Sequence, residues 1–228
     1  MRDRETGLTR GLPGGLGASV PIAVGYLPAG FAFGVAARQA GLVPAEATLM
    51  SLIVYSGSSQ FALLSLLASG ASWAAMLIIP LVLSLRHLLY GPALAPRLRE
   101  VGTWRAAVVA FGLDDEVFAV SAVKMPRGNG FGWILGLELG AYASWALGTL
   151  VGGVTGAALI EGLPSLVPAF SFALPALFVA LLVPLVSSPG DDTTERGAVL
   201  STRSLKAAAV ASGAVATLFG LTGLGNWG

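Results

Sequence analysis

Apolar runs long enough to cross a lipid bilayer recur along almost the whole chain, and they constrain its fold more than any other feature. A helix needs about 20 mostly apolar residues to span the hydrocarbon core. Only 11% of the residues are charged, against about a quarter in soluble domains. The predicted class is therefore all-α, a polytopic integral membrane protein with about seven transmembrane helices, one or more of them interrupted. The predicted runs are 16–37, 45–69, 73–94, 105–123, 131–157, 163–187 and 204–224.

Short polar connections hold most of the charges, so one transmembrane domain over residues 1–228 is predicted. The first run is too long for a signal peptide, and a multi-pass protein of the cell inner (plasma) membrane is expected. With seven crossings, loop Lys and Arg divide eight to four in favour of a cytoplasmic N-terminus. A re-entrant 45–69 run would make the division six to six. Arg97, Arg99 and Arg105 lie on the unfavoured side of the seven-crossing arrangement.

The composition excludes several functional classes. The chain has no cysteine and one histidine, which rules out disulfides and the usual zinc ligand sets. No metal and no cofactor is expected. A net charge of +1 gives no indication of a nucleic-acid partner. No phosphate-binding glycine loop is present, and serine-hydrolase and aspartyl-protease patterns are incomplete around Ser58 and Asp114. The chain is therefore predicted not to be an enzyme.

The first polar segment interrupts the second apolar run. A helix break at Gly57 would free backbone N–H groups at a half-helix N-terminus, which binds substrate carboxylates in several transporters. A continuous helix with Ser and Gln bonded to neighbouring helices is the alternative. Pro28 in the first run removes a backbone hydrogen bond, and two adjacent interrupted spans indicate a site at the membrane midplane. The segment comprises Tyr55, Ser56, Gly57, Ser58, Ser59 and Gln60.

A second polar segment, Arg86 and His87, lies past the middle of the third run. Arg86 has three interpretations: an ion pair with a nearby acid, contact with a substrate carboxylate, or extension to the membrane interface. His87 is the side chain whose ordinary pKa lies near neutrality, so it suits proton coupling. The alternative for His87 is a structural hydrogen bond.

Three adjacent carboxylates, Asp114, Asp115 and Glu116, form the third polar segment. Successive side chains on a helix point about 100° apart, so these three cannot all face one partner. Ionisable residues inside a membrane are costly and indicate function. The functional interpretation is an amine-binding or proton-carrying acid. The alternatives are a pair with Arg86 or a helix end at the interface. Glu138, in the fifth run, is a further intramembrane acid.

Small residues recur every four positions in the fifth run. Such a stripe lets another helix approach closely. The partner is either a helix of this chain or a separate subunit. The stripe consists of Gly136, Gly140, Ser144, Gly148, Gly152 and Gly156, with a weaker one at Ala208, Ser212, Ala216 and Gly220.

Four motifs occur in a specific order, Pro28-Ala29-Gly30-Phe31-Ala32-Phe33-Gly34, Tyr55-Ser56-Gly57-Ser58-Ser59-Gln60-Phe61, Leu85-Arg86-His87-Leu88-Leu89-Tyr90 and Leu113-Asp114-Asp115-Glu116-Val117-Phe118. Together they resemble the AzlC family, the large subunits of branched-chain amino acid exporters. The resemblance implies about seven spans, a small AzlD-like membrane subunit, and efflux of valine, leucine and isoleucine. Ser84 departs from the larger amide that is expected there in many relatives.

The expected function is a secondary transporter exporting neutral branched-chain amino acids, driven by protons because no nucleotide motif is present. The first polar segment and Arg86 are expected to bind the substrate carboxylate. Phe31 and Phe33 are expected to contact its aliphatic side chain. His87 and the three carboxylates are expected to bind its amine or the coupling proton. The alternative is a channel or a non-transport membrane scaffold subunit.

Overall fold

The computed structural model describes residues 11–98, 101–126 and 130–162. Contacts between Cα atoms divide the chain into two units, residues 1–174 and 175–228, and all described residues belong to the first. The predicted runs 163–187 and 204–224, and the weaker stripe from Ala208 to Gly220, lie outside the described residues. Every regular element in the described part is a helix, which confirms the all-α class.

Three long apolar segments have the length and composition to cross a membrane. They are α2 (Leu12–Gln39), the segment formed by α5 (Trp73–Ser84), α6 (His87–Leu94) and η1 (Ala95–Arg97), and α9 (Gly130–Gly162). They match the predicted runs 16–37, 73–94 and 131–157. The predicted interruption of the first run is wrong, because α2 continues through Pro21 and Pro28. Neighbouring helices let transmembrane helices tolerate proline.

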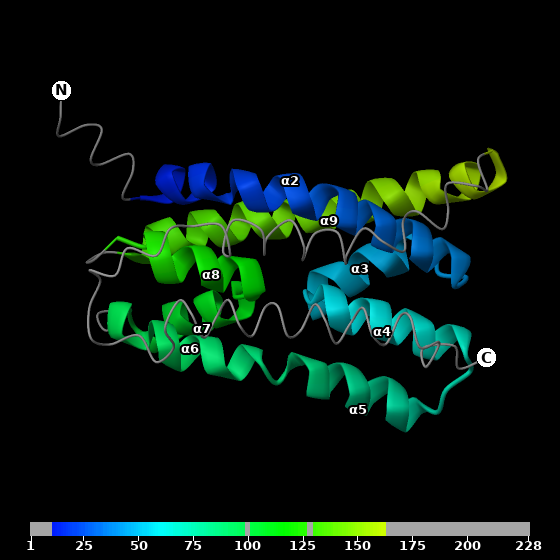
Figure 1. The fold of residues 1–228 in the computed structure, drawn as a ribbon, viewed down its shortest axis with the longest axis horizontal. Helices are drawn as coiled ribbons and strands as arrows, with labels where there is room; N and C mark the ends of the chain where they lie inside the picture. The colour runs from blue at the N-terminus through cyan, green and yellow to red at the C-terminus, as the bar shows by residue number, and fades with distance from the viewer. Residues whose placement is uncertain (1–10, 99–100, 127–129, 163–228) are drawn as a thin grey trace, which may run out of the picture. The chain divides into compact units, whose positions relative to one another are not determined.

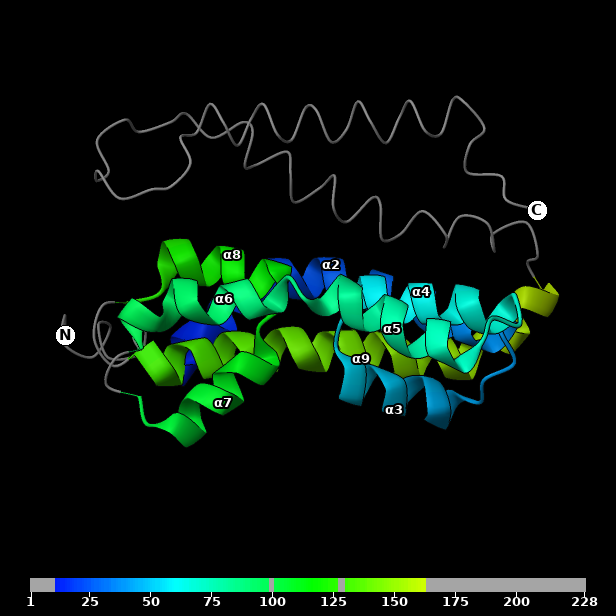
Figure 2. The same ribbon diagram turned by 90° about the horizontal axis from the view of Figure 1, so that it is seen from below.

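The other two predicted runs in the described part form helical hairpins. Helices α3 (Pro44–Val54) and α4 (Gly57–Ala68) lie at the end of the fold where α2 finishes, as both ribbon views show (Figures 1 and 2). Helices α7 (Thr103–Gly112) and α8 (Asp115–Lys124) lie at the opposite end, where α9 begins. At about 1.5 Å per residue, each of these helices covers roughly half of the ~30 Å hydrocarbon core. Runs 45–69 and 105–123 therefore turn back, and the described residues contain three segments long and apolar enough to cross a membrane.

This arrangement changes the distribution of positive charges. Arg97, Arg105 and Lys124 now lie at the end of the fold where α2 begins, and Arg38 lies at the end where α2 finishes. The seven-crossing prediction put Arg97 and Arg105 on the unfavoured side. Two hairpins in place of two crossings bring them to the same end of the fold as Lys124.

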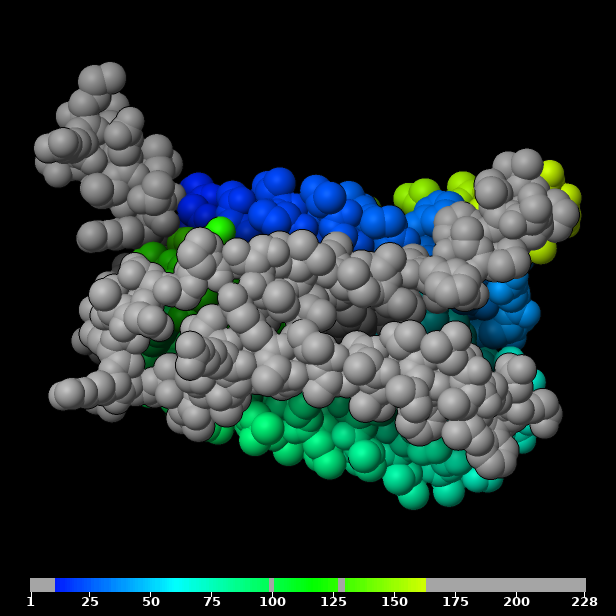
Figure 3. Space-filling model, viewed as in Figure 1, coloured from blue at the N-terminus to red at the C-terminus, as the bar shows by residue number. Residues whose placement is uncertain are grey.

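Helices α2 and α9 pack backbone against backbone along a glycine seam. A Cβ added to Gly148 would lie 2.5 Å from the Leu27 carbonyl oxygen, and one added to Gly30 would lie 2.5 Å from the Trp145 carbonyl oxygen. Gly136 and Gly152 meet the α2 backbone in the same way. The small-residue stripe is therefore an internal seam, and the alternative of a seam with a separate subunit is wrong. In the space-filling view, α2 forms one edge of the described part and α5 the other (Figure 3).

Candidate functional site

Three interruptions between consecutive helices bring the predicted polar segments together. They lie between α3 and α4 at Tyr55–Ser56, between α5 and α6 at Leu85–Arg86, and between α7 and α8 at Leu113–Asp114. Both ribbon views place these breaks toward the middle of the long helices, where the hairpin tips approach each other (Figures 1 and 2). The N-termini of α4, α6 and α8 thus all lie in the central region. Helix N-termini carry unpaired N–H groups and partial positive charge.

The break in the second run is confirmed, but its geometry belongs to Tyr55 and not to Gly57. Tyr55 has φ 32° and ψ 54°, in the left-handed region. Ser56 is extended, with φ −152°, and Gly57 is the first residue of α4. A non-glycine residue at positive φ is uncommon and costs of order 1–3 kcal/mol, and such residues gather at functional sites. The first turn of α4 contains no acidic residue, so its positive end is not neutralised locally.

Serine hydroxyls tie the start of α4 to α5. Ser59 Oγ lies 2.9 Å from Ser84 Oγ and donates to the Pro80 carbonyl oxygen at 3.1 Å. Ser56 Oγ donates to Ser59 Oγ at 3.1 Å. A serine at position 84 leaves room for this contact, whereas a larger amide would occupy it. Ser56 and Ser59 therefore hold the α3–α4 break against the C-terminal end of α5.

Gln60 is fully buried and both ends of its amide are bonded within the chain. Its Nε2 donates to Ser51 Oγ at 2.9 Å, and its Oε1 accepts from Trp145 Nε1 at 3.0 Å. Ser51 in turn lies 2.8 Å from Thr149 Oγ1. The network joins α3, α4 and α9. These contacts match the predicted alternative in which Gln60 bonds to neighbouring helices.

Gln60→Leu is expected to destabilise the protein by about 2 kcal/mol, because a buried donor left without a partner costs about 1–3 kcal/mol. The indole N–H of Trp145 would lose its acceptor. Thermal denaturation in detergent, followed by the monodisperse fraction, measures the effect. Ser65→Ala on the same helix is the control, because Ser65 is exposed and bonds only to the Phe61 carbonyl oxygen. Equal thermal stability of the two variants would contradict a structural role for Gln60.

Arg86 connects the two hairpins. Its Nη2 donates to Ser58 Oγ at 2.8 Å and lies 3.0 Å from Asp115 Oδ2. Its Nε is enclosed and has no partner among the described residues. The side chain is 36% exposed, so the remaining donors are within reach of a ligand. Of the three interpretations of Arg86, the ion pair is the one that the geometry contains.

The three carboxylates divide between two sets of partners: Asp114 and Glu116 share Tyr26, and Asp115 bonds to Tyr90 and Arg86. Asp114 caps α8, and its Oδ1 accepts from the Asp115 N–H at 2.8 Å. Tyr26 donates to Glu116 Oε2 at 2.5 Å and approaches Asp114 Oδ2 at 3.1 Å. Asp115 accepts from Tyr90 and pairs with Arg86. The positive end of α8 favours carboxylates in its first turn, which explains how three acids are accommodated here.

His87 links the α5–α6 break to the acidic segment. Its Nδ1 lies 3.0 Å from the Ser84 carbonyl oxygen, and its Nε2 lies 3.3 Å from Asp114 Oδ1. Both neighbours accept hydrogen bonds, so a protonated ring would donate to both. The ring stands edge-on to Tyr90, with 5.5 Å between centroids. His87 therefore joins the same network as the carboxylates.

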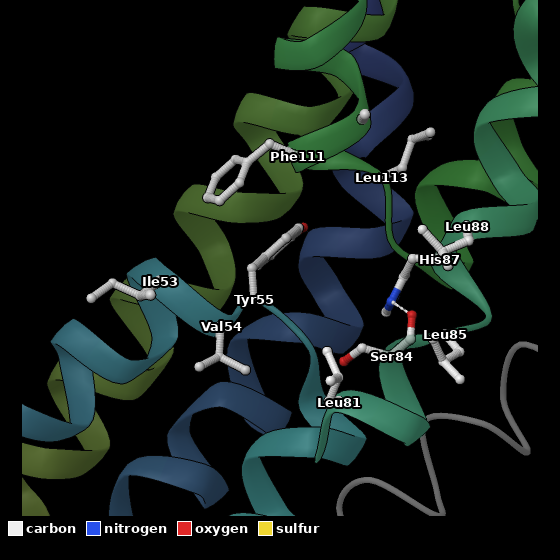
Figure 4. A pocket seen from close by; sticks show the side chains of 11 residues that line it. Ile53, Val54, Tyr55, Leu81, Ser84, Leu85, His87, Leu88, Phe111 and Leu113 are labelled. Atoms are coloured by element: carbon white, nitrogen blue, oxygen red, sulfur yellow. Dashed lines mark hydrogen bonds between the residues drawn. The ribbon is translucent and has the colours of Figure 1, made fainter. Parts of the chain in front are cut away.

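A cavity of about 340 Å³ opens where the three breaks meet. The Tyr55 side chain lines it, between the Ile53 and Phe111 side and the His87 and Leu85 side (Figure 4). The Tyr55 hydroxyl is enclosed and has no partner among the described residues. Small-molecule pockets are mostly apolar with a few polar groups, and their volumes begin at about 300 Å³. The apolar wall comprises Ile53, Val54, Leu81, Leu85, Leu88, Ala110, Phe111 and Leu113.

The predicted apolar contacts lie elsewhere. Phe33 is buried in the core, 5.5 Å from the Phe61 ring and 6.4 Å from the Trp145 ring between centroids. The backbone of Phe31 packs against Gly148 and Gly152 of α9. The cavity wall comes instead from apolar residues, aliphatic except for Phe111, that flank each polar segment in the sequence. Their position beside the breaks was the signal that could have identified them.

These features define a class, the helical membrane proteins in which half-helices and interrupted spans meet around a central cavity. The AzlC protein family model matches residues 21–159, and the chain belongs to this family. It is 39% identical over 170 residues to the inner membrane protein YgaZ of Escherichia coli, covering 72% of this chain and 69% of that protein. It is 39% identical over 214 residues to an uncharacterized membrane protein of Archaeoglobus fulgidus, covering 94% and 87%.

A third relative carries a functional name. The chain is 26% identical over 170 residues to the branched-chain amino acid transport protein AzlC of Bacillus subtilis, covering 72% of this chain and 64% of that protein. No solved structure matches the chain. The predicted resemblance to the AzlC family is confirmed.

Proposed function

We propose that the protein is a secondary transporter that exports valine, leucine and isoleucine across the inner membrane. The observation that carries the proposal is the cavity at the three breaks, with an aliphatic wall and a polar edge formed by Tyr55, Ser84 and His87. A branched-chain amino acid has the same division into an apolar side chain and a charged end. The name of the Bacillus subtilis relative supports the same substrate class.

The proposed pose uses the charge distribution around the cavity. The substrate carboxylate lies near the N-terminus of α4 and Arg86, because helix N-termini and guanidinium groups favour anions. Ser58 orients the guanidinium through its 2.8 Å hydrogen bond. The amine faces Asp114 and its neighbours on α8. Ser59 and Gln60 stabilise the helices around the site and do not contact the substrate, since their polar atoms are bonded within the chain.

Orientation and direction are part of the proposal. Three described cations, Arg97, Arg105 and Lys124, lie at the end where α2 begins, against Arg38 at the other end. The positive-inside rule then favours a cytoplasmic N-terminus.

Export is driven by an ion gradient, for which protons are the proposed ion. A small AzlD-like membrane subunit is the proposed partner, and its co-purification with the full chain would test this.

Tyr55→Phe is expected to raise KM for valine efflux about tenfold with thermal stability unchanged. The hydroxyl has no partner in the described part of the chain, so its loss removes no internal bond. A hydrogen bond to a charged ligand group contributes about 1.5–3 kcal/mol, which exceeds the 1.4 kcal/mol of a tenfold change in affinity. Efflux from cells loaded with a valine dipeptide, measured over a range of internal valine concentrations, gives KM.

Tyr142→Phe is the matched control. The Tyr142 ring lies 4.8 Å from the Tyr55 ring, and its hydroxyl donates to the Leu52 carbonyl oxygen at 2.6 Å. This variant is expected to lose stability and keep its KM. An unchanged KM in Tyr55→Phe would remove Tyr55 from the site. Efflux that is neither saturable nor stereoselective would indicate a channel, and no efflux would favour a scaffold subunit.

A further inference from the structure

Glu138 is a buried acid that the proposed substrate site does not use. It lies in α9, and only 4% of its surface is exposed. Its Oε1 is enclosed without a partner, and Glu138 makes no hydrogen bond or ion pair within the described residues. Asp114, Asp115 and Glu116 each have hydroxyl, imidazole or guanidinium partners. Glu138 is therefore chemically different from the three acids of α8.

The end of α7 closes over the Glu138 carboxyl group. A Cβ added to Gly112, the last residue of α7, would lie 2.6 Å from Glu138 Cδ and 2.7 Å from Oε2. Glycine at this position thus allows the helix end to contact the acid. Gly112 directly precedes the α7–α8 break at Leu113. The residue that contacts Glu138 therefore lies at the tip of the α7–α8 hairpin.

Among the residues that the structure describes, the titratable neighbours of Glu138 supply no positive charge. Tyr55, at the end of α3, lies within electrostatic reach of Asp114, Glu116 and Glu138. Tyr142 follows one turn later on α9 itself. Arg105 of α7 is near the start of that helix, over the Phe131 ring at 5.1 Å. The acid therefore lies near the Tyr55 phenol and the C-terminal end of α7, and that helix end carries partial negative charge.

A charged carboxylate in this position would be costly. Burial of an unpaired charge costs several kcal/mol or more, and the group then takes up a proton instead. A neutral carboxylic acid avoids this cost and can donate its proton to a nearby acceptor. The arrangement seen is thus suited to Glu138 in its protonated form.

We propose that Glu138 is the proton-carrying acid of the transporter, held neutral while α7 covers it and exposed to water when the α7–α8 hairpin moves away from α9. On exposure the carboxyl O–H bond breaks, the proton passes to water, and the carboxylate remains until the next protonation. This inference rests on the proposed export function, because it assigns the coupling step of that transport. The α8 carboxylates then bind the substrate amine and position Arg86 and His87.

Infrared spectroscopy tests the protonated state independently of transport. The full chain in lipid vesicles at neutral pH is expected to show the carbonyl stretch of a protonated carboxylic acid. Glu138→Gln is expected to remove this band with the chain still folded, because glutamine has nearly the same shape. Glu161→Gln, at an exposed position of the same helix, is expected to keep it. A band unaffected by Glu138→Gln would overturn the proposal whatever the transport activity is.

Transport assays in the same vesicles test the coupling. A leucine gradient is expected to drive proton movement, reported by a trapped pH-sensitive dye, in the unmodified protein and in Glu161→Gln. Glu138→Gln is expected to lose at least 90% of this proton movement and of net leucine transport against a gradient, and to keep leucine–leucine exchange. Glu138→Asp, which retains an acid, is expected to restore part of the coupling.

The outcomes separate the two proposals. Proton-coupled net transport that persists in Glu138→Gln would overturn the role of Glu138 and leave the export function standing. Leucine transport without proton movement in the unmodified protein would also overturn the role of Glu138 and leave the export function standing. An unmodified protein that moves no branched-chain amino acid would overturn the export function and with it the coupling role, and the infrared band would then only report the protonated state.

Discussion

Gly34→Leu is expected to abolish accumulation of folded protein. A Cβ at position 34 would lie 2.5 Å from the Gly153 backbone nitrogen and 2.9 Å from the Gly152 carbonyl carbon. Both atoms belong to backbone, so no side-chain rotation can relieve the overlap. The two helices would have to separate along their whole seam, because Gly30 and Gly148 meet in the same close approach. Overpacking of a core costs about 1–3 kcal/mol and sometimes more. Because Gly34→Leu would push two whole helices apart, its destabilisation is expected at the upper end of this range.

Gly17→Leu is the matched control on the same helix. A Cβ at Gly17 meets no described residue within 4 Å, and leucine is a better helix former than glycine by most of 1 kcal/mol. The yield of monodisperse protein after detergent extraction, and its midpoint of thermal denaturation, measure both variants. We expect Gly17→Leu to equal or exceed the unmodified protein. Normal yield of Gly34→Leu would mean that α2 and α9 do not pack as described.

Arg86→Ala is expected to reduce valine efflux by roughly 100-fold, the second large effect. Arg86 pairs with Asp115 at 3.0 Å and contacts Ser58 at 2.8 Å, so it joins the two hairpins at the cavity. Truncation of Arg86 leaves the Asp115 carboxylate without its paired cation. It also removes the guanidinium group that is proposed to bind the substrate carboxylate. A hydrogen bond to a charged group contributes about 1.5–3 kcal/mol, and about 2.7 kcal/mol corresponds to 100-fold in rate.

A double-mutant cycle with Asp115→Ala separates the ion pair from substrate contact. If Arg86 acts only by pairing with Asp115, the double variant is expected to be no worse than either single variant. Direct substrate contact by Arg86 predicts a further loss in the double variant. Arg86→Lys keeps the charge without the planar fork. Arg105→Ala, at an exposed position, is the control and is expected to keep efflux within twofold. Efflux from Arg86→Ala at the control level would remove Arg86 from the mechanism.

The convergence of the polar segments was predictable because each one carries groups that hydrocarbon does not solvate. Arg86, His87 and the acids of α8 could avoid lipid only by meeting one another or a water-filled space. Their specific pairing was not predictable. The choice of Asp115 as the partner of Arg86, and of Tyr26 as the donor to Glu116, depends on where α2 and the hairpins lie. Trp145 as the partner of Gln60, and Thr149 as the partner of Ser51, come from a distant part of the chain for the same reason.

The sequence alone determined that the protein is helical and that it lies in a membrane. These properties follow from local composition, because apolar length and unsatisfied backbone groups act within a single segment. Only the tertiary structure decided that runs 45–69 and 105–123 return to the side they entered. A run of about 20 apolar residues has the same hydropathy whether it crosses or turns back. The direction after each break is decided by packing against α2, α5 and α9, and that packing also forms the cavity and encloses Glu138.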